Sequence, residues 1–72
     1  MDKPDWSEAP EWAKWLAQDK DGDWYWWQDE PVVLREPFWM PNADDTGEIG
    51  LAKPAKFNEV ILEWTTNLEQ RP

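Results

Sequence analysis

The chain has 72 residues, of which sixteen are acidic and seven are basic, so its net charge is −9 at pH 7. It contains no cysteine and no histidine, which excludes disulfides and cysteine-ligated zinc and removes the commonest general base. The negative charge disfavours direct binding to nucleic acid or to anionic membranes, because phosphate groups would be repelled. The length allows one domain, which we place over residues 1–72.

Tryptophan is the unusual component, with eight residues in a chain too short to bury a large conventional core. Each indole can remove roughly 150–250 Å² from water, so we expect most of them to be buried. The predicted core tryptophans are Trp15, Trp24, Trp26 and Trp64. Eight exceeds what a domain of this size needs, and exposed aromatic residues often mark binding sites. The predicted exposed anchors are Tyr25, Trp27 and Trp39.

The first elements are an arm and a hairpin. Residues 1–11 are predicted to be an extended arm broken by two prolines, with Trp6 packing across the sheet. Two aromatic-rich runs then predict strands over Ala13–Gln18 and Trp24–Gln28. The acidic turn between them contains Gly22, which we expect to supply the positive φ of a tight hairpin loop.

The second strand is expected to be the central one, because large side chains alternate between its two faces. These side chains are, in order, Trp24, Tyr25, Trp26 and Trp27. A third strand begins at Val32–Arg35 and continues, after a break, through Phe38–Met40. Prolines at both ends of that continuation suit an edge strand, and the three strands form a β-meander over residues 12–41.

The remaining chain is predicted to be a loop followed by a helix. Residues 42–56 are rich in glycine, proline and acids and indicate a long loop. Residues 57–70 place apolar side chains at helical spacing, with Asn58 as the N-cap. The β-branched residues leave a strand at Glu59–Trp64 as the alternative. The predicted fold class is therefore α+β: a small three-stranded antiparallel sheet with an N-terminal arm and one C-terminal helix.

The sequence offers few candidates for a metal site or a catalytic site. The turn Asp19-Lys20-Asp21-Gly22-Asp23 has the composition of a calcium loop, but its glycine stands at position four instead of six. Without a nucleophile elbow, a phosphate loop or a histidine, we expect no enzyme, no cofactor and no metal. Binding through charge and aromatic anchors remains. The predicted negative face consists of Asp19, Asp21, Asp23, Asp29, Glu30, Asp44, Asp45 and Glu48. Such a face suits a partner protein with a basic surface, as in proteins that imitate DNA phosphates.

Three strings resemble a family. They are Asp5-Trp6-Ser7-Glu8-Ala9-Pro10-Glu11-Trp12-Ala13, Gln18-Asp19-Lys20-Asp21-Gly22-Asp23-Trp24-Tyr25-Trp26 and the closing Trp64-Thr-Thr-Asn-Leu68-Glu69-Gln-Arg71-Pro72. They look like small acidic, tryptophan-rich proteins of tailed bacteriophages. The resemblance implies a viral protein in the cytoplasm of an infected bacterium that binds and blocks a host enzyme or defence factor. The first residues carry no apolar signal-peptide segment, which agrees with a cytoplasmic location.

Other functions stay open at this point. The order Trp15, Asp21-Gly22, Trp26-Trp27, Trp39 and Pro41 is similar to a WW domain over residues 12–41, which implies binding of proline-rich peptides. Exposed tryptophans could instead form a carbohydrate platform. A small virion or assembly component, with no inhibitory surface, is a further alternative.

Overall fold

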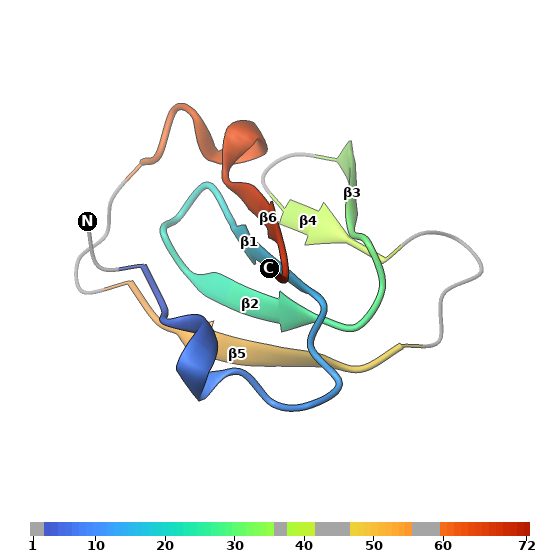
Figure 1. The fold of residues 1–72 in the computed structure, drawn as a ribbon. Helices are drawn as coiled ribbons and strands as arrows, with labels where there is room; N and C mark the ends of the chain where they lie inside the picture. Colours follow the sequence, from blue (N-terminus) through green and yellow to red (C-terminus); the bar gives the residue numbers. More distant parts are fainter. Residues whose placement is uncertain (1–2, 36–37, 42–46, 56–59) are drawn as a thin grey trace.

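Figure 1 shows the computed structural model of the chain, which describes residues 3–35, 38–41, 47–55 and 60–72. A four-stranded antiparallel sheet has the strand order β5-β2-β1-β6, and a separate two-stranded sheet pairs β3 with β4. The strands are β1 (Trp15–Gln18), β2 (Trp24–Trp27), β3 (Val32–Arg35), β4 (Phe38–Met40), β5 (Ile49–Lys53) and β6 (Leu68–Gln70). The described residues also form two 3-10 turns, η1 (Trp6–Glu8) and η2 (Trp64–Thr66).

The β1–β2 hairpin forms where the sequence predicts it, with Trp15 opposite Trp27 and Gln18 opposite Trp24. The amide of Asp19 donates to the carbonyl of Asp23 at 2.8 Å and closes the turn. Gly22 has φ +100°, which confirms the predicted positive φ. The turn therefore depends on a backbone conformation that glycine adopts without steric cost.

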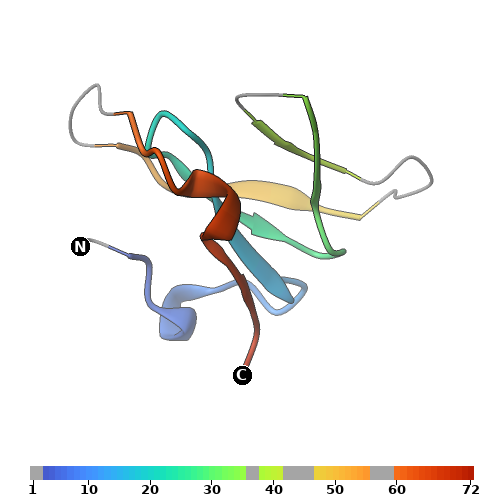
Figure 2. The same cartoon turned by 90° about the horizontal axis from the view of Figure 1, so that it is seen from above.

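Two tryptophan clusters cover the two faces of the four-stranded sheet. On one face, the buried Leu16, Trp24 and Trp26 meet Trp6 and Trp12 of the N-terminal arm. On the other face lies a second cluster, whose buried members are Ala17, Trp27, Trp39 and Trp64. Figure 2 shows the arm and the β3–β4 hairpin on opposite sides of the sheet. β2 lies inside the sheet, between β5 and β1, so the predicted central position and alternation are confirmed.

The predicted α+β class is wrong, because the described residues contain strands and 3-10 turns but no α-helix. Over the predicted helix 57–70, the chain makes η2 and then β6, and the part of the alternative strand at Glu59–Trp64 that is described is not a strand either. Residues 56–59 lie outside the described residues. The free edge of β1 explains the outcome: its backbone groups need partners, and β6 supplies them by pairing Ala17 with Leu68 and Trp15 with Gln70.

Two further boundaries differ from the sequence prediction. The predicted loop 42–56 contains β5, which pairs with the second edge of β2; residues 42–46 are not described. Phe38–Met40 is not a continuation of the third strand, because it turns back as β4 and pairs with β3. β3 therefore leaves the sheet of β1 and β2, and the small hairpin that it forms covers the Trp27 face instead.

Candidate functional site

Two of the three predicted aromatic anchors are buried. Trp27 is 5% exposed and Trp39 is 8% exposed, whereas Tyr25 is half-buried. The prediction that Trp27 and Trp39 stand on the surface is wrong, because the β3–β4 hairpin and η2 cover that face of the sheet. Among the predicted core residues, Trp24, Trp26 and Trp64 are buried and Trp15 is partly buried.

Trp39 joins the two sheets. Its indole Nε1 donates to the carbonyl of Gln18 at 2.8 Å, and its backbone amide donates to Oδ1 of Asp19 at 3.0 Å. Its ring meets Trp64 edge-on, with centroids 6.0 Å apart and an interplanar angle of 84°. The buried side chain of Gln18 also takes part, donating to the carbonyl of Gly22 and accepting from Asn67. We call Trp39 and its partners Gln18, Asp19 and Trp64 the Trp39 clamp, because their contacts hold the two sheets together.

Asp19 is part of the Trp39 clamp, so its predicted place in an exposed negative face is wrong. Its side chain is buried, and burial raises its pKa to about 6 against the opposing effect of the Trp39 hydrogen bond. The neighbouring carboxylates of Asp21 and Asp23 raise the pKa further. Burial, followed by the charges of these same acids, also raises the pKa of Tyr25. The acids of the turn therefore act on one another and on Tyr25.

The other predicted acids fall into two groups at opposite ends of β2. In the turn, the exposed Asp21 accepts from the amide of Asp23, and Asp23 accepts from the amide of Ala55 at 2.7 Å. At the far end lies a group that we call the distal acids: Asp29, Glu30 and Glu48, all of them exposed. Asp44 and Asp45 lie outside the described residues.

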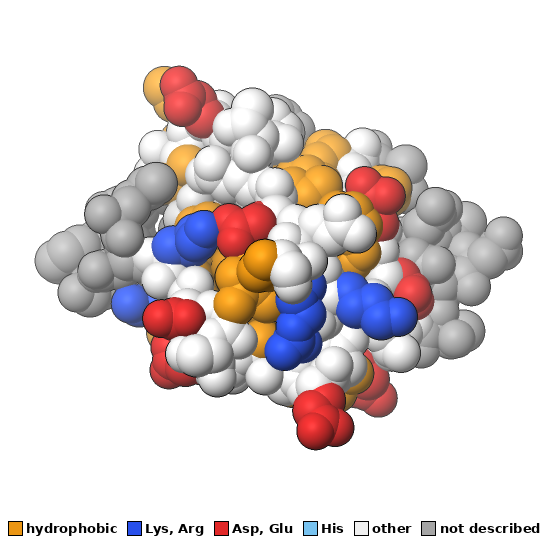
Figure 3. Space-filling view, viewed as in Figure 1, with side chains coloured by type: hydrophobic (Ala, Val, Ile, Leu, Met, Phe, Trp, Pro, Cys, Tyr) orange, Lys and Arg blue, Asp and Glu red, His pale blue; other side chains and the backbone are white. Residues whose placement is uncertain are grey.

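The distal acids are held together by the chain around them. The amide of Gln28 donates to the carbonyl of Glu48 at 3.0 Å, and the Gln28 side chain accepts from the Glu48 amide at 2.9 Å. The backbone of Glu48 therefore lies beside the end of β2, near the point where Asp29 and Glu30 follow that strand. On the face seen in Figure 3, acidic side chains are separated and basic ones lie among them, so this face is not continuously negative.

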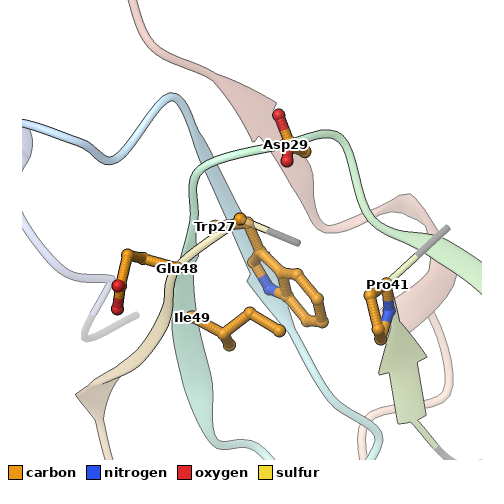
Figure 4. A pocket seen from close by; sticks show the side chains of 6 residues that line it. Trp27, Asp29, Pro41, Glu48 and Ile49 are labelled. Atoms are coloured by element: carbon orange, nitrogen blue, oxygen red, sulfur yellow. The ribbon is translucent and has the colours of Figure 1, made fainter. Parts of the chain in front are cut away.

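A shallow hollow, partly open to solvent and with room for about one water molecule, lies beside Asp29 and Glu48. Figure 4 shows Trp27 between Ile49 and Pro41, with the carboxylates of Asp29 and Glu48 pointing away from the hollow in different directions. The Nε1 of Trp27 is buried and has no hydrogen-bond partner. The hollow is therefore apolar and too small to hold a side chain of a partner.

The sequence prediction missed the apolar edge that continues from this hollow along β5. Ile49 is 43% exposed and Leu51 is 55% exposed, and both lie beside the Trp27 face of the sheet, opposite Trp27 and Tyr25. Gly50 faces the other way, 3.5 Å from the Trp12 ring as measured from an ideal Cβ. The alternation of large and small residues from Ile49 to Ala52 was the available signal for a strand.

No metal site emerges from the described residues, since no three of their acidic side chains converge as ligands. Within the same residues, no helix has the length and apolar character needed to cross a membrane. Comparisons with protein-family models, curated proteins and solved structures found no match.

Proposed function

We propose that this protein is an acidic binding protein that occludes a basic surface on another protein. The observation that supports the proposal is the grouping of the exposed distal acids beside the partly exposed Ile49 and Leu51. Charge of one sign speeds the encounter with an oppositely charged partner, and apolar contacts slow its dissociation. This combination favours a protein partner over free nucleic acid.

The partner that suits this surface is a protein that itself grips nucleic acid. Such proteins carry basic grooves, and carboxylates at their mouth would compete with phosphates. Following the phage resemblance, we propose that the partner is a host defence or nucleic-acid-handling factor in the bacterial cytoplasm. In that role the protein needs no catalytic group and no cofactor.

The test is capture from bacterial lysate by three versions of the chain. One variant neutralises the distal acids with Asp29→Asn, Glu30→Gln and Glu48→Gln. The matched control neutralises three exposed acids elsewhere, with Glu8→Gln, Glu11→Gln and Glu63→Gln. Each variant removes three negative charges, so both change the net charge from −9 to −6. Only their position differs.

We expect the wild-type chain and the control to retain the same basic, nucleic-acid-binding protein, in a manner that weakens with salt. The distal-acid variant should lose it. The captured protein should release a labelled DNA when the wild-type chain is added. Equal capture by all three chains, or capture without displacement of DNA, would contradict the proposal.

A further inference from the structure

β5 is an edge strand whose outward backbone groups can be identified. The Gln28 amide donates to the Glu48 carbonyl, so these residues form a hydrogen-bonded pair of the β2–β5 ladder. Antiparallel ladders alternate hydrogen-bonded and non-hydrogen-bonded pairs. Ile49 and Leu51, opposite Trp27 and Tyr25, are therefore in non-hydrogen-bonded pairs. Their N–H and C=O groups point away from β2, toward the open edge.

The same two residues present apolar side chains. Ile49 and Leu51 are both large, both partly exposed and both on the Trp27 face, two residues apart. A peptide that added itself as a strand would bond to their backbone and place its own alternate side chains beside theirs. Backbone bonds would supply affinity, and the apolar pair would set which residues the peptide carries.

The charges at the two ends of β5 indicate which kind of peptide would bind. The distal acids lie at the Glu48 end of β5, and Lys53 is the last residue at the opposite end of the strand. A peptide with lysine or arginine next to its apolar residues matches the Glu48 end. A second copy of the chain matches less well, because each copy carries a net charge of −9. The register shift near Tyr25, with Pro54 following the strand, limits the usable edge to its first residues.

We infer that the edge of β5 accepts an extended segment of the partner as an added strand, with alternating apolar residues and basic residues at the end that meets the distal acids. This inference rests on the proposed function and specifies how the partner is held. It concerns backbone pairing at Ile49 and Leu51, which the capture experiment does not examine.

The experiment uses a fluorescein-labelled peptide of three Val-Thr repeats followed by two lysines, so that a strand antiparallel to β5 places its lysines at the Glu48 end. Binding is measured by fluorescence anisotropy with the complete chain. A second peptide carries glutamates in place of the lysines. Two further peptides are N-methylated on alternate amides, one in each of the two possible registers, so that one of them loses the donors that face β5 while its side chains stay in place. We expect the lysine peptide to bind. The exchange of lysine for glutamate and one of the two methylation patterns should each weaken binding at least about tenfold.

A substitution in β5 tests the same backbone hydrogen bonds by changing the protein instead of the peptide. Leu51→Pro removes the outward N–H without removing a bond to β2, as edge strands tolerate. Leu51→Thr shortens the apolar side chain and keeps the N–H, so it is the matched control. The proline variant should bind at least about threefold more weakly than the threonine variant. Tryptophan fluorescence of both variants confirms that they are folded.

Three outcomes would overturn the inference: both N-methylated peptides binding as tightly as the unmethylated lysine peptide, no binding of the lysine peptide at about 1 mM, or a dimer of the chain that Leu51→Pro dissociates. Each leaves the proposed function intact if the distal-acid variant still loses its captured partner. If the lysine peptide binds but the capture experiment fails, the edge of β5 recognises basic strands and the proposed class of partner is wrong.

Discussion

Trp39 donates its backbone amide to the carboxylate of Asp19 at 3.0 Å, and this bond fixes β4 to the closed end of the β1–β2 hairpin. The carboxylate is buried there, and its pKa rises from 3.8 to about 6. The residue that the sequence suggests as part of a surface charge is therefore part of the junction between the two sheets.

The Asp19 carboxylate should make the folded protein less stable as the pH rises. The folded state binds the proton more tightly than the unfolded state, so stability is lost from about pH 4 to about pH 6 and is then constant. Asp19→Asn keeps an acceptor for the Trp39 amide but cannot ionise. Relative to wild type, it should gain on the order of 2 kcal/mol between pH 4 and pH 7.

Urea unfolding followed by tryptophan fluorescence at several pH values measures this difference. Asp21→Asn is the control, because it removes a neighbouring charge from an exposed position. Its effect should be smaller and should follow the same direction, since Asp21 raises the pKa of Asp19. A gap between Asp19→Asn and wild type that does not change with pH would contradict the buried carboxylate.

The indoles of Trp39 and Trp27 form a matched pair for a second prediction. Both are buried on the same face, but Trp39 donates to the Gln18 carbonyl whereas the Nε1 of Trp27 has no partner. Trp39→Phe loses packing and leaves that carbonyl unpaired, while Trp27→Phe loses packing alone. We expect Trp39→Phe to be more destabilising by about 1–2 kcal/mol in chemical unfolding. Equal losses would show that the hydrogen bond to Gln18 contributes nothing.

Glycine positions supply a third prediction. Gly22 has φ +100°, and an added Cβ would lie 3.1 Å from the Cβ of Ala55. Gly22→Ala should therefore cost about 1–2 kcal/mol of stability. At Gly50 an added Cβ meets the Trp12 ring at an ordinary 3.5 Å, so Gly50→Ala should change stability by no more than about 0.5 kcal/mol. Thermal unfolding of the two variants compares them, and the reverse order would contradict the turn geometry.

Arg71 joins the two ends of the chain and gives a fourth prediction. Its Nη1 donates to the carbonyls of Pro10 at 3.1 Å and Ala13 at 2.7 Å, and its guanidinium lies 5.7 Å from the centroid of the Trp6 ring. Arg71→Met should cost about 1 kcal/mol, because the carbonyls of Pro10 and Ala13 lose their shared Nη1 donor. Arg71→Lys should recover part of the loss. Proteolysis near Trp6 should accelerate in the methionine variant, and an unchanged cleavage rate would dismiss this role.

The hairpin and its aromatic alternation could be predicted from the sequence because both depend on local features. Gly22 and the acids around it define a turn, and strand period fixes which side of β2 each ring occupies. Nothing local tells whether an aromatic residue on that strand is covered. Trp27 is covered because the β3–β4 hairpin and η2, far away in sequence, fold over it.

For the C-terminal segment, the local sequence pattern predicts the wrong structure. Its apolar spacing matches a helix, yet Leu68–Gln70 becomes β6, because β1 would otherwise leave an edge without partners. Tertiary pairing overrides local spacing in such short segments. The edge of β5 was missed for the same reason, since its Gly50 and the following Pro54 are typical of a loop when no partner strand is known.

The most direct test of the proposed binding edge is amide hydrogen exchange at Ile49, Gly50 and Leu51, measured by NMR on the free chain and with the lysine peptide in excess. The ladder predicts a slow Gly50 amide and fast Ile49 and Leu51 amides in the free protein, with both fast amides becoming protected when the peptide binds. Protection of Ile49 and Leu51 without peptide, or exchange that the bound peptide leaves unchanged, would contradict an open edge that accepts a strand.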